Sequence, residues 1–180
     1  MDIKLRIRLT GIGLSLAAGV VPLVAYSQIY LTEEQAHQLM FPGDKFTRHM
    51  IALSDEEIKL IEKKSDERVR NRQLIVWVSA AKNAILVDQV LGKHEFITLA
   101  VGIEKSKTVK DIEILEYRET YGYQVREEKW RQQFVGKSSA APLKVGQDII
   151  NISGATLSST HVTAGVRRLV QTYEIVQGRL

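Results

Sequence analysis

Cysteine is absent from the 180 residues of the chain. This absence excludes disulfides, thiolate metal sites, cysteine-ligated iron–sulfur clusters and cysteine nucleophiles. It also excludes a lipid anchor attached to an N-terminal cysteine. It leaves the compartment open, because an exported protein need not contain cysteine.

Several common site motifs are missing as well. The sequence has no phosphate-binding loop pattern and no Gly-x-Ser-x-Gly elbow of an esterase. Gly11-Ile12-Gly13 lies in an apolar N-terminal run, so it is not a dinucleotide-binding fingerprint. The histidines lack metal-ligand spacing and are interpreted as surface or partly buried residues: His37, His49, His94 and His161. The sequence therefore predicts no catalytic residue of these classes and no metal site.

The overall composition is that of a globular domain, with 44% hydrophobic and 26% charged residues. The net charge is +4, and part of it lies in the first eight residues. Further along, bases alternate with acids, as in Arg126-Glu127-Glu128-Lys129. Such mixing is typical of a solvated face. The charge pattern therefore argues against a nucleic acid partner.

The N-terminal residues 1–27 resemble a secretory signal. Three cations come first, at Lys4, Arg6 and Arg8, and an apolar run from Leu9 to Ala25 follows. Ala25-Tyr26-Ser27 then offers small residues at the positions that a signal peptidase reads, which predicts cleavage before Gln28. The alternative is an uncleaved anchor, although the run is slightly short for a span of about 20 residues and contains Pro22. We expect a periplasmic protein, or one on the periplasmic face of the inner membrane if the segment is retained.

Two capping boxes indicate helices in residues 28–71. Thr32-Glu33-Glu34-Gln35 predicts a helix from Glu33 to Met40, and Ser54-Asp55-Glu56-Glu57 predicts another to about Lys64. Residues 28–71 are therefore interpreted as an N-terminal helical segment, separate from a domain over residues 72–180.

The rest of the chain predicts an α+β fold, with an antiparallel sheet packed against helices and a C-terminal helix after a turn of small residues. Short polar turns separate four apolar runs, which are expected to form a meander of strands: Gln73–Ala80, Ala84–Leu91, Phe96–Ile103 and Val109–Tyr117. A short helix within Glu127–Phe134 and a helix from Ser158 or Ser159 follow. Four aromatic residues are expected in the core: Trp77, Tyr117, Tyr123 and Trp130.

One segment, Ile150 to Ser159, combines small and hydroxyl residues before the last helix. From local physics, Ser153 and Thr156 are turn residues and Ser158 is a helix N-cap. Its central residues, Ser153-Gly154-Ala155-Thr156, also resemble the Ser/Thr-Gly-Ala-Thr motif of the FMN-binding domain family. That family includes the G subunit of the Rnf electron-transport complex and the C subunit of the sodium-pumping NADH:quinone oxidoreductase.

In that family the motif threonine bears FMN through a phosphoester bond, which a magnesium-dependent flavin transferase makes from FAD. The resemblance implies that Thr156 carries FMN covalently, which would make the chain a phosphoprotein. It also implies that the neighbouring motif residues bind the cofactor: Ser153, Gly154, Ala155, Leu157, Ser158 and Ser159. A phosphodiester at this place would meet the free N–H groups and the dipole of a helix N-terminus.

A second stretch supports the resemblance. Glu119-Thr120-Tyr121-Gly122 is similar to the family's Glu-Thr-Pro-Gly loop, which lies near the flavin, with Tyr121 in place of the proline. This implies cofactor-binding roles for Glu119, Thr120, Tyr121 and Gly122. The resemblance extends from about Phe96 to Val176. Relatives often have an acidic residue six positions before the threonine, where this chain has Ile150, with Asp148 and Asn151 nearby.

These patterns together predict an exported electron-transfer flavoprotein. The expected partners are a flavin transferase for maturation and membrane-bound redox proteins. Two alternatives remain open from the sequence. One is a non-redox binding or structural module that keeps the fold without the flavin, and the other is a flavin-dependent reductase, which the lack of a nicotinamide fingerprint disfavours.

Overall fold

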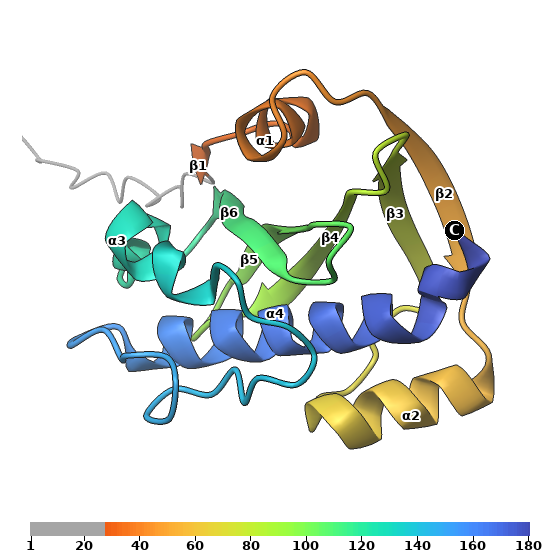
Figure 1. The fold of residues 1–180 in the computed structure, drawn as a ribbon. Coiled ribbons are helices and arrows are strands. Elements are labelled where there is room, and N and C mark those ends of the chain that lie inside the picture. Colours follow the sequence, from red (N-terminus) through yellow and green to blue (C-terminus); the bar gives the residue numbers. More distant parts are fainter. Residues whose placement is uncertain (1–27) are drawn as a thin grey trace, which may run out of the picture.

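Six antiparallel strands form one sheet in the order β1-β6-β5-β4-β3-β2 in the computed structural model, which describes residues 28–180 (Figure 1). The sheet and its packed helices confirm the α+β fold class. The predicted signal segment, residues 1–27, lies outside the described residues. Among residues 28–180, no helix combines the length and the apolar character needed to cross a membrane.

The predicted meander forms the centre of the sheet. Its strands are β3 (Gln73–Ser79), β4 (Ala84–Leu91), β5 (Phe96–Ile103) and β6 (Val109–Tyr117), each antiparallel to the next. These bounds follow the apolar runs of the sequence. The reason is that strands in the middle of a sheet are buried on both faces and therefore show continuous apolar stretches.

Residues 28–71 are not purely helical, contrary to expectation. Helices α1 (Glu33–Met40) and α2 (Asp55–Ser65) form as predicted, each with its capping box. Between them, however, β2 (Phe46–Ala52) pairs with β3 over its full length, and β1 (Gln28–Ile29) pairs with the end of β6. Strand β2 lies at the sheet edge, where Ile51 is its one buried side chain, so the sequence carries little strand pattern there.

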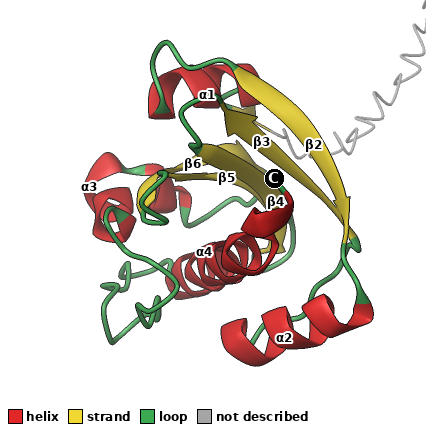
Figure 2. Cartoon of the chain, turned by 45° about the vertical axis from the view of Figure 1, so that its right-hand side comes forward, coloured by secondary structure: helices red, strands yellow, loops and turns green. Residues whose placement is uncertain are grey.

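Helices cover both faces of the sheet (Figures 1 and 2). On one face, α4 (Thr156–Val176) and α2 pack on a large apolar core that contains Leu99, Val101 and Val166. On the other face, α1 covers a smaller cluster that includes Met40 and Ile85. The sheet is therefore a central layer, and α4 runs along it with its first residue at one end.

Short helices connect β6 to the rest of the chain: η1 (Tyr123–Arg126), α3 (Glu128–Arg131) and η2 (Gln132–Phe134). The last two lie within Glu127–Phe134, where a short helix was expected. Trp130 and Tyr117 are buried as predicted. Tyr123, expected in the core, is instead 56% exposed, because it stands at the start of η1 on the surface.

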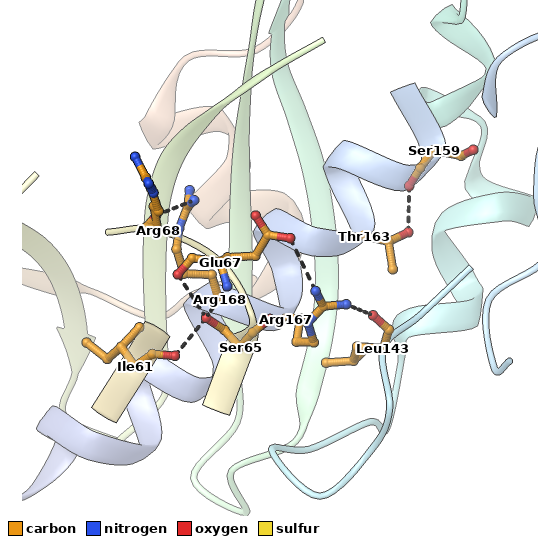
Figure 3. A network of polar contacts seen from close by, with 9 residues as sticks. All are labelled: Ile61, Ser65, Glu67, Arg68, Leu143, Ser159, Thr163, Arg167 and Arg168. Carbon is orange, nitrogen blue, oxygen red and sulfur yellow. Dashed lines mark hydrogen bonds and ion pairs between the residues drawn. The ribbon is translucent and has the colours of Figure 1, made fainter. Parts of the chain in front are cut away.

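Two buried arginines fix α4 against the segment that follows α2 (Figure 3). Arg167 donates to the carbonyl oxygens of Ser65 and Leu143 and to the carboxylate of Glu67. Arg168 donates to the carbonyl oxygen of Arg68 and pairs with Asp88 on β4. These bonds satisfy carbonyl groups at the C-terminal end of α2 and hold the middle of α4 in a fixed place.

Candidate functional site

A cavity of about 470 Å³ lies between the two sequence stretches that the resemblance singled out. Three segments line it: the turn after β4, the loop after β6, and the turn that begins α4. The lining residues are Lys93, His94, Glu119, Thr120, Tyr121, Gly154, Ala155, Thr156, Leu157 and Ser158. The fold therefore brings together two stretches more than 30 residues apart in the sequence.

The turn before α4 is tight and accessible. Gly154 has φ +80°, a conformation that suits glycine, and the N–H of Ala155 donates to the carbonyl of Ile152 at 3.0 Å. Helix α4 begins at Thr156, two residues earlier than expected, with Ala155 as N-cap. Ser158 is therefore not the cap. Thr156 is exposed, whereas the side chains of Ser158 and Ser159 are buried in the first turn.

The N-terminus of α4 differs from those of α1 and α2. Both of those helices have complete capping boxes, whereas no side chain of the described residues caps α4. The first N–H groups of a helix need an acceptor, and they attract an anion when no side chain supplies one. The 21-residue α4 thus begins beside the cavity with donors available to a ligand.

Thr156 and Ser159 are linked through Asn151, which sequence reasoning did not assign to the site. The Nδ2 of Asn151 donates to Thr156 Oγ1 at 3.0 Å, and its Oδ1 accepts from Ser159 Oγ at 2.6 Å. Ser159 itself does not line the cavity, and neither does Ser153. Asn151 comes five residues before Thr156, and a spacing of five carries no motif that would have marked it.

Ile150, which stands where relatives often have an acid, turns its side chain to solvent and is 74% exposed. Its backbone is held at both ends, because Trp130 Nε1 donates to its carbonyl and its N–H donates to Gln133 Oε1. Asp148 closes its own turn instead of approaching Thr156. It accepts from the N–H groups of Leu143 and Lys144 and pairs with Lys137 at 3.1 Å.

The opposite wall is the loop after β6, which Glu119 fixes to the turn after β4. One oxygen of Glu119 accepts from the backbone N–H groups of His94 at 2.6 Å and Glu95 at 3.1 Å. Burial raises the pKa of Glu119, but the backbone hydrogen bonds from His94, Glu95 and Lys93 outweigh this and lower it below its ordinary value. A Cβ at Gly92 would lie 2.5 Å from that oxygen, so glycine leaves room for the contact.

Tyr117, at the end of β6, joins this loop to α4. Its hydroxyl donates to the carbonyl of Tyr121 and lies 3.0 Å from Ser158 Oγ. Gly122 packs against the same two hydroxyl groups and does not line the cavity. Tyr121 is 81% exposed, so its ring stands free at the cavity wall.

Lys93 and His94 are cavity residues that no sequence motif marks. They follow β4, some 60 residues before the Thr156 turn, and a short charged turn is an ordinary feature of a meander. The antiparallel pairing of β4 with β5 and of β5 with β6 places the ends of β4 and β6 at the same edge of the sheet, with β5 between the two strands. Their cavity position is therefore a consequence of the sheet order.

Comparison with known proteins agrees with this site. Residues 92–171 match the family model of the FMN-binding domain. No curated protein matches the chain. The matched stretch starts at Gly92, which lies against the Glu119 side chain, and it includes both walls of the cavity and most of α4. The resemblance to the FMN-binding domain family seen in the sequence is thereby confirmed over residues 92–171.

Proposed function

We propose that this protein is an exported electron-transfer flavoprotein that carries FMN on Oγ1 of Thr156 through a phosphoester bond. The observation that carries the proposal is the position of Thr156. It is exposed, it lines a cavity of about 470 Å³, and it is the first residue of a helix that no described side chain caps.

The residues of the site suit a bound FMN. A phosphodiester on Thr156 would lie next to the first N–H groups of α4, which favour an anion. The cavity volume falls within the range of small-molecule sites, about 300–1,000 Å³. Gly154 and Ala155 add no bulk beside Thr156, which leaves a modifying enzyme access to the hydroxyl. Lys93 adds a positive charge to the cavity wall.

When bound, FMN supplies transfer of one or two electrons, and the protein holds and tunes it. The cavity walls contribute the fixed loop at Glu119, the free ring of Tyr121 and the cation of Lys93. We assign no catalytic acid, base or nucleophile here. The proposed role is therefore that of an electron carrier between redox partner proteins at the membrane, after maturation by a flavin transferase.

Export gives the covalent bond a purpose. A cofactor that is not covalently bound can be lost by dilution outside the cytoplasm, whereas a phosphoester bond keeps it on the protein. N-terminal sequencing of the mature protein from a periplasmic fraction is expected to begin at Gln28. Recovery of the full chain from membranes would indicate the uncleaved anchor instead.

Intact-mass analysis tests the flavin attachment. The chain is co-expressed with a flavin transferase, and the wild-type protein is expected to gain the mass of FMN and a yellow, reducible chromophore. Thr156→Ala is expected to lose both. Thr156→Ser is the matched control, because it keeps a hydroxyl at the same place and should retain some labelling. A wild-type protein without any adduct would refute the covalent proposal.

A further inference from the structure

We propose that Asn151 is the residue that positions the Thr156 hydroxyl for flavin transfer. The inference rests on the proposed function and concerns how this chain presents its acceptor group. Asn151 Nδ2 lies 3.0 Å from Thr156 Oγ1, within hydrogen-bond distance. The contact holds for either orientation of the amide, since a threonine hydroxyl can donate or accept.

Asn151 is itself held at its other end. Its Oδ1 accepts from Ser159 Oγ at 2.6 Å, and Ser159 is fully buried in the first turn of α4. The same hydroxyl lies 3.1 Å from the carbonyl oxygens of Ala155 and Thr156. A buried serine thus fixes the amide, and the amide fixes the exposed hydroxyl of Thr156. Such support of a reacting group by anchored neighbours is what positions it for reaction.

The backbone beside Asn151 is also fixed. Trp130 Nε1 donates to the carbonyl of Ile150 at 2.9 Å, and Gln133 Oε1 accepts from the N–H of Ile150 at 2.7 Å. The side chain of Ile150 is 74% exposed, and Asp148 is bound to Leu143, Lys144 and Lys137. Of Asp148, Ile150 and Asn151, the residue that hydrogen-bonds to Thr156 is therefore Asn151.

The reaction that this contact would assist is a phosphoryl transfer from FAD. A bond forms between Thr156 Oγ1 and the phosphorus of the FMN moiety, the bond from that phosphorus to the bridging oxygen of the pyrophosphate breaks, and AMP leaves. The hydroxyl proton passes to a base of the transferase. No electrons are transferred in this step. The hydrogen bond between Asn151 and Thr156 holds Oγ1 in one place for this attack.

The rate of flavin transfer measures the contribution of Asn151. Purified chain without flavin is mixed with a flavin transferase, FAD and Mg²⁺, and labelling is followed by flavin fluorescence in denaturing gels. Asn151→Ala is expected to lower the maximal rate by about 10- to 100-fold, as for a misplaced reacting group. The concentration of acceptor protein at half-maximal rate should stay unchanged, because the transferase still recognises the same turn.

Asn151→Asp is the conservative variant. A carboxylate of the same size can accept from both Thr156 and Ser159, so this variant is expected to label within a few-fold of wild type. Ile150→Ala is the matched control at the neighbouring, solvent-facing position, and it should label as wild type does. Thermal unfolding of each variant checks that the fold is intact. If Asn151→Ala does not fold, Asn151→Ser removes the contact with a shorter polar side chain.

The outcomes separate this inference from the proposed function. A slow Asn151→Ala variant that Asn151→Asp restores supports the positioning role. If the wild-type chain is labelled and Asn151→Ala is labelled equally fast, the inference is overturned. The same holds if Asn151→Asp is labelled as slowly as Asn151→Ala. Both results leave the covalent flavin in place. A wild-type chain that is never labelled refutes both.

Discussion

The hydroxyl groups of Tyr117 and Ser158 lie 3.0 Å apart, where the end of β6 meets the first turn of α4. Both side chains are buried, and the Tyr117 hydroxyl also donates to the carbonyl of Tyr121. This contact joins the two walls of the cavity. The distance between the Thr156 turn and the loop at Glu119 is therefore set by buried groups rather than by the exposed residues that face a ligand.

Replacement of Tyr117 by Phe is expected to lower the free energy of unfolding by about 1–3 kcal/mol, because it leaves the Tyr121 carbonyl and the Ser158 hydroxyl without this partner. Urea unfolding followed by circular dichroism measures the loss. The matched control is Tyr123→Phe, whose ring is 56% exposed and whose change should stay within about 0.5 kcal/mol. Equal stability of the two variants would contradict the proposed bridge.

Gly122 should tolerate no side chain, for two separable reasons. It has φ +94°, and a Cβ would overlap Ser158 Oγ and lie 2.6 Å from the Tyr117 hydroxyl. Gly136 has φ +77° but open space around its Cα. Gly136→Ala therefore measures the backbone strain alone and is expected to lower the free energy of unfolding by about 1–2 kcal/mol. Gly122→Ala is expected to lower it by at least about 2 kcal/mol more, because the added Cβ also overlaps its neighbours. Thermal unfolding compares them, and similar losses would show that the space at Gly122 is not limiting.

Glu119 predicts a dependence of stability on pH. Burial raises the pKa of its carboxyl group, but backbone hydrogen bonds hold that pKa below its ordinary value. Its stabilising effect is therefore fully present above the ordinary pKa of about 4.3 and is lost as the pH falls through the lower folded-state pKa. Glu119→Gln should cost about 1–2 kcal/mol at pH 7.

The loss for Glu119→Gln should shrink as the pH drops below about 4, where the wild-type carboxylate also becomes protonated. Unfolding curves of both proteins between pH 7 and pH 3 test this. A difference that stays constant over that range would show that the charge on Glu119 does not hold the loop.

Lys93 predicts an effect on the redox potential of the flavin-loaded protein. Lys93 lines the cavity, and a positive charge nearby stabilises the electrons that a bound flavin accepts. Lys93→Gln should shift the potential to more negative values by roughly 20–40 mV, or about 0.5–1 kcal/mol for one electron. Spectroelectrochemical titration measures it, with Lys129→Gln as the control, since Lys129 is exposed on α3 and does not line the cavity. An equal shift in both variants would point to net charge instead.

Local sequence patterns predicted an element correctly where the bonds that define it lie within that element. The capping boxes at Thr32 and Ser54 give the starts of α1 and α2, because the bonds involved lie within four residues of each other. No sequence pattern marks strand β2, because its pairing with β3 holds it in place and only one of its side chains is buried. Helix α4 starts two residues before the predicted position, because Ser158 and Ser159, which are typical N-cap residues, are instead buried in its first turn.

The amino-acid sequence by itself indicated the family and the residue proposed as acceptor, because the Ser153-Gly154-Ala155-Thr156 turn and the Glu119 loop are short, contiguous motifs. The tertiary structure alone decided what surrounds Thr156. Sheet order brings Lys93 and His94 to the cavity, and the fold of the turn sets Asn151 against Thr156 Oγ1 while Ile150 faces solvent. These contacts depend on strand pairing and on the direction of side chains in space, which no spacing along the chain encodes.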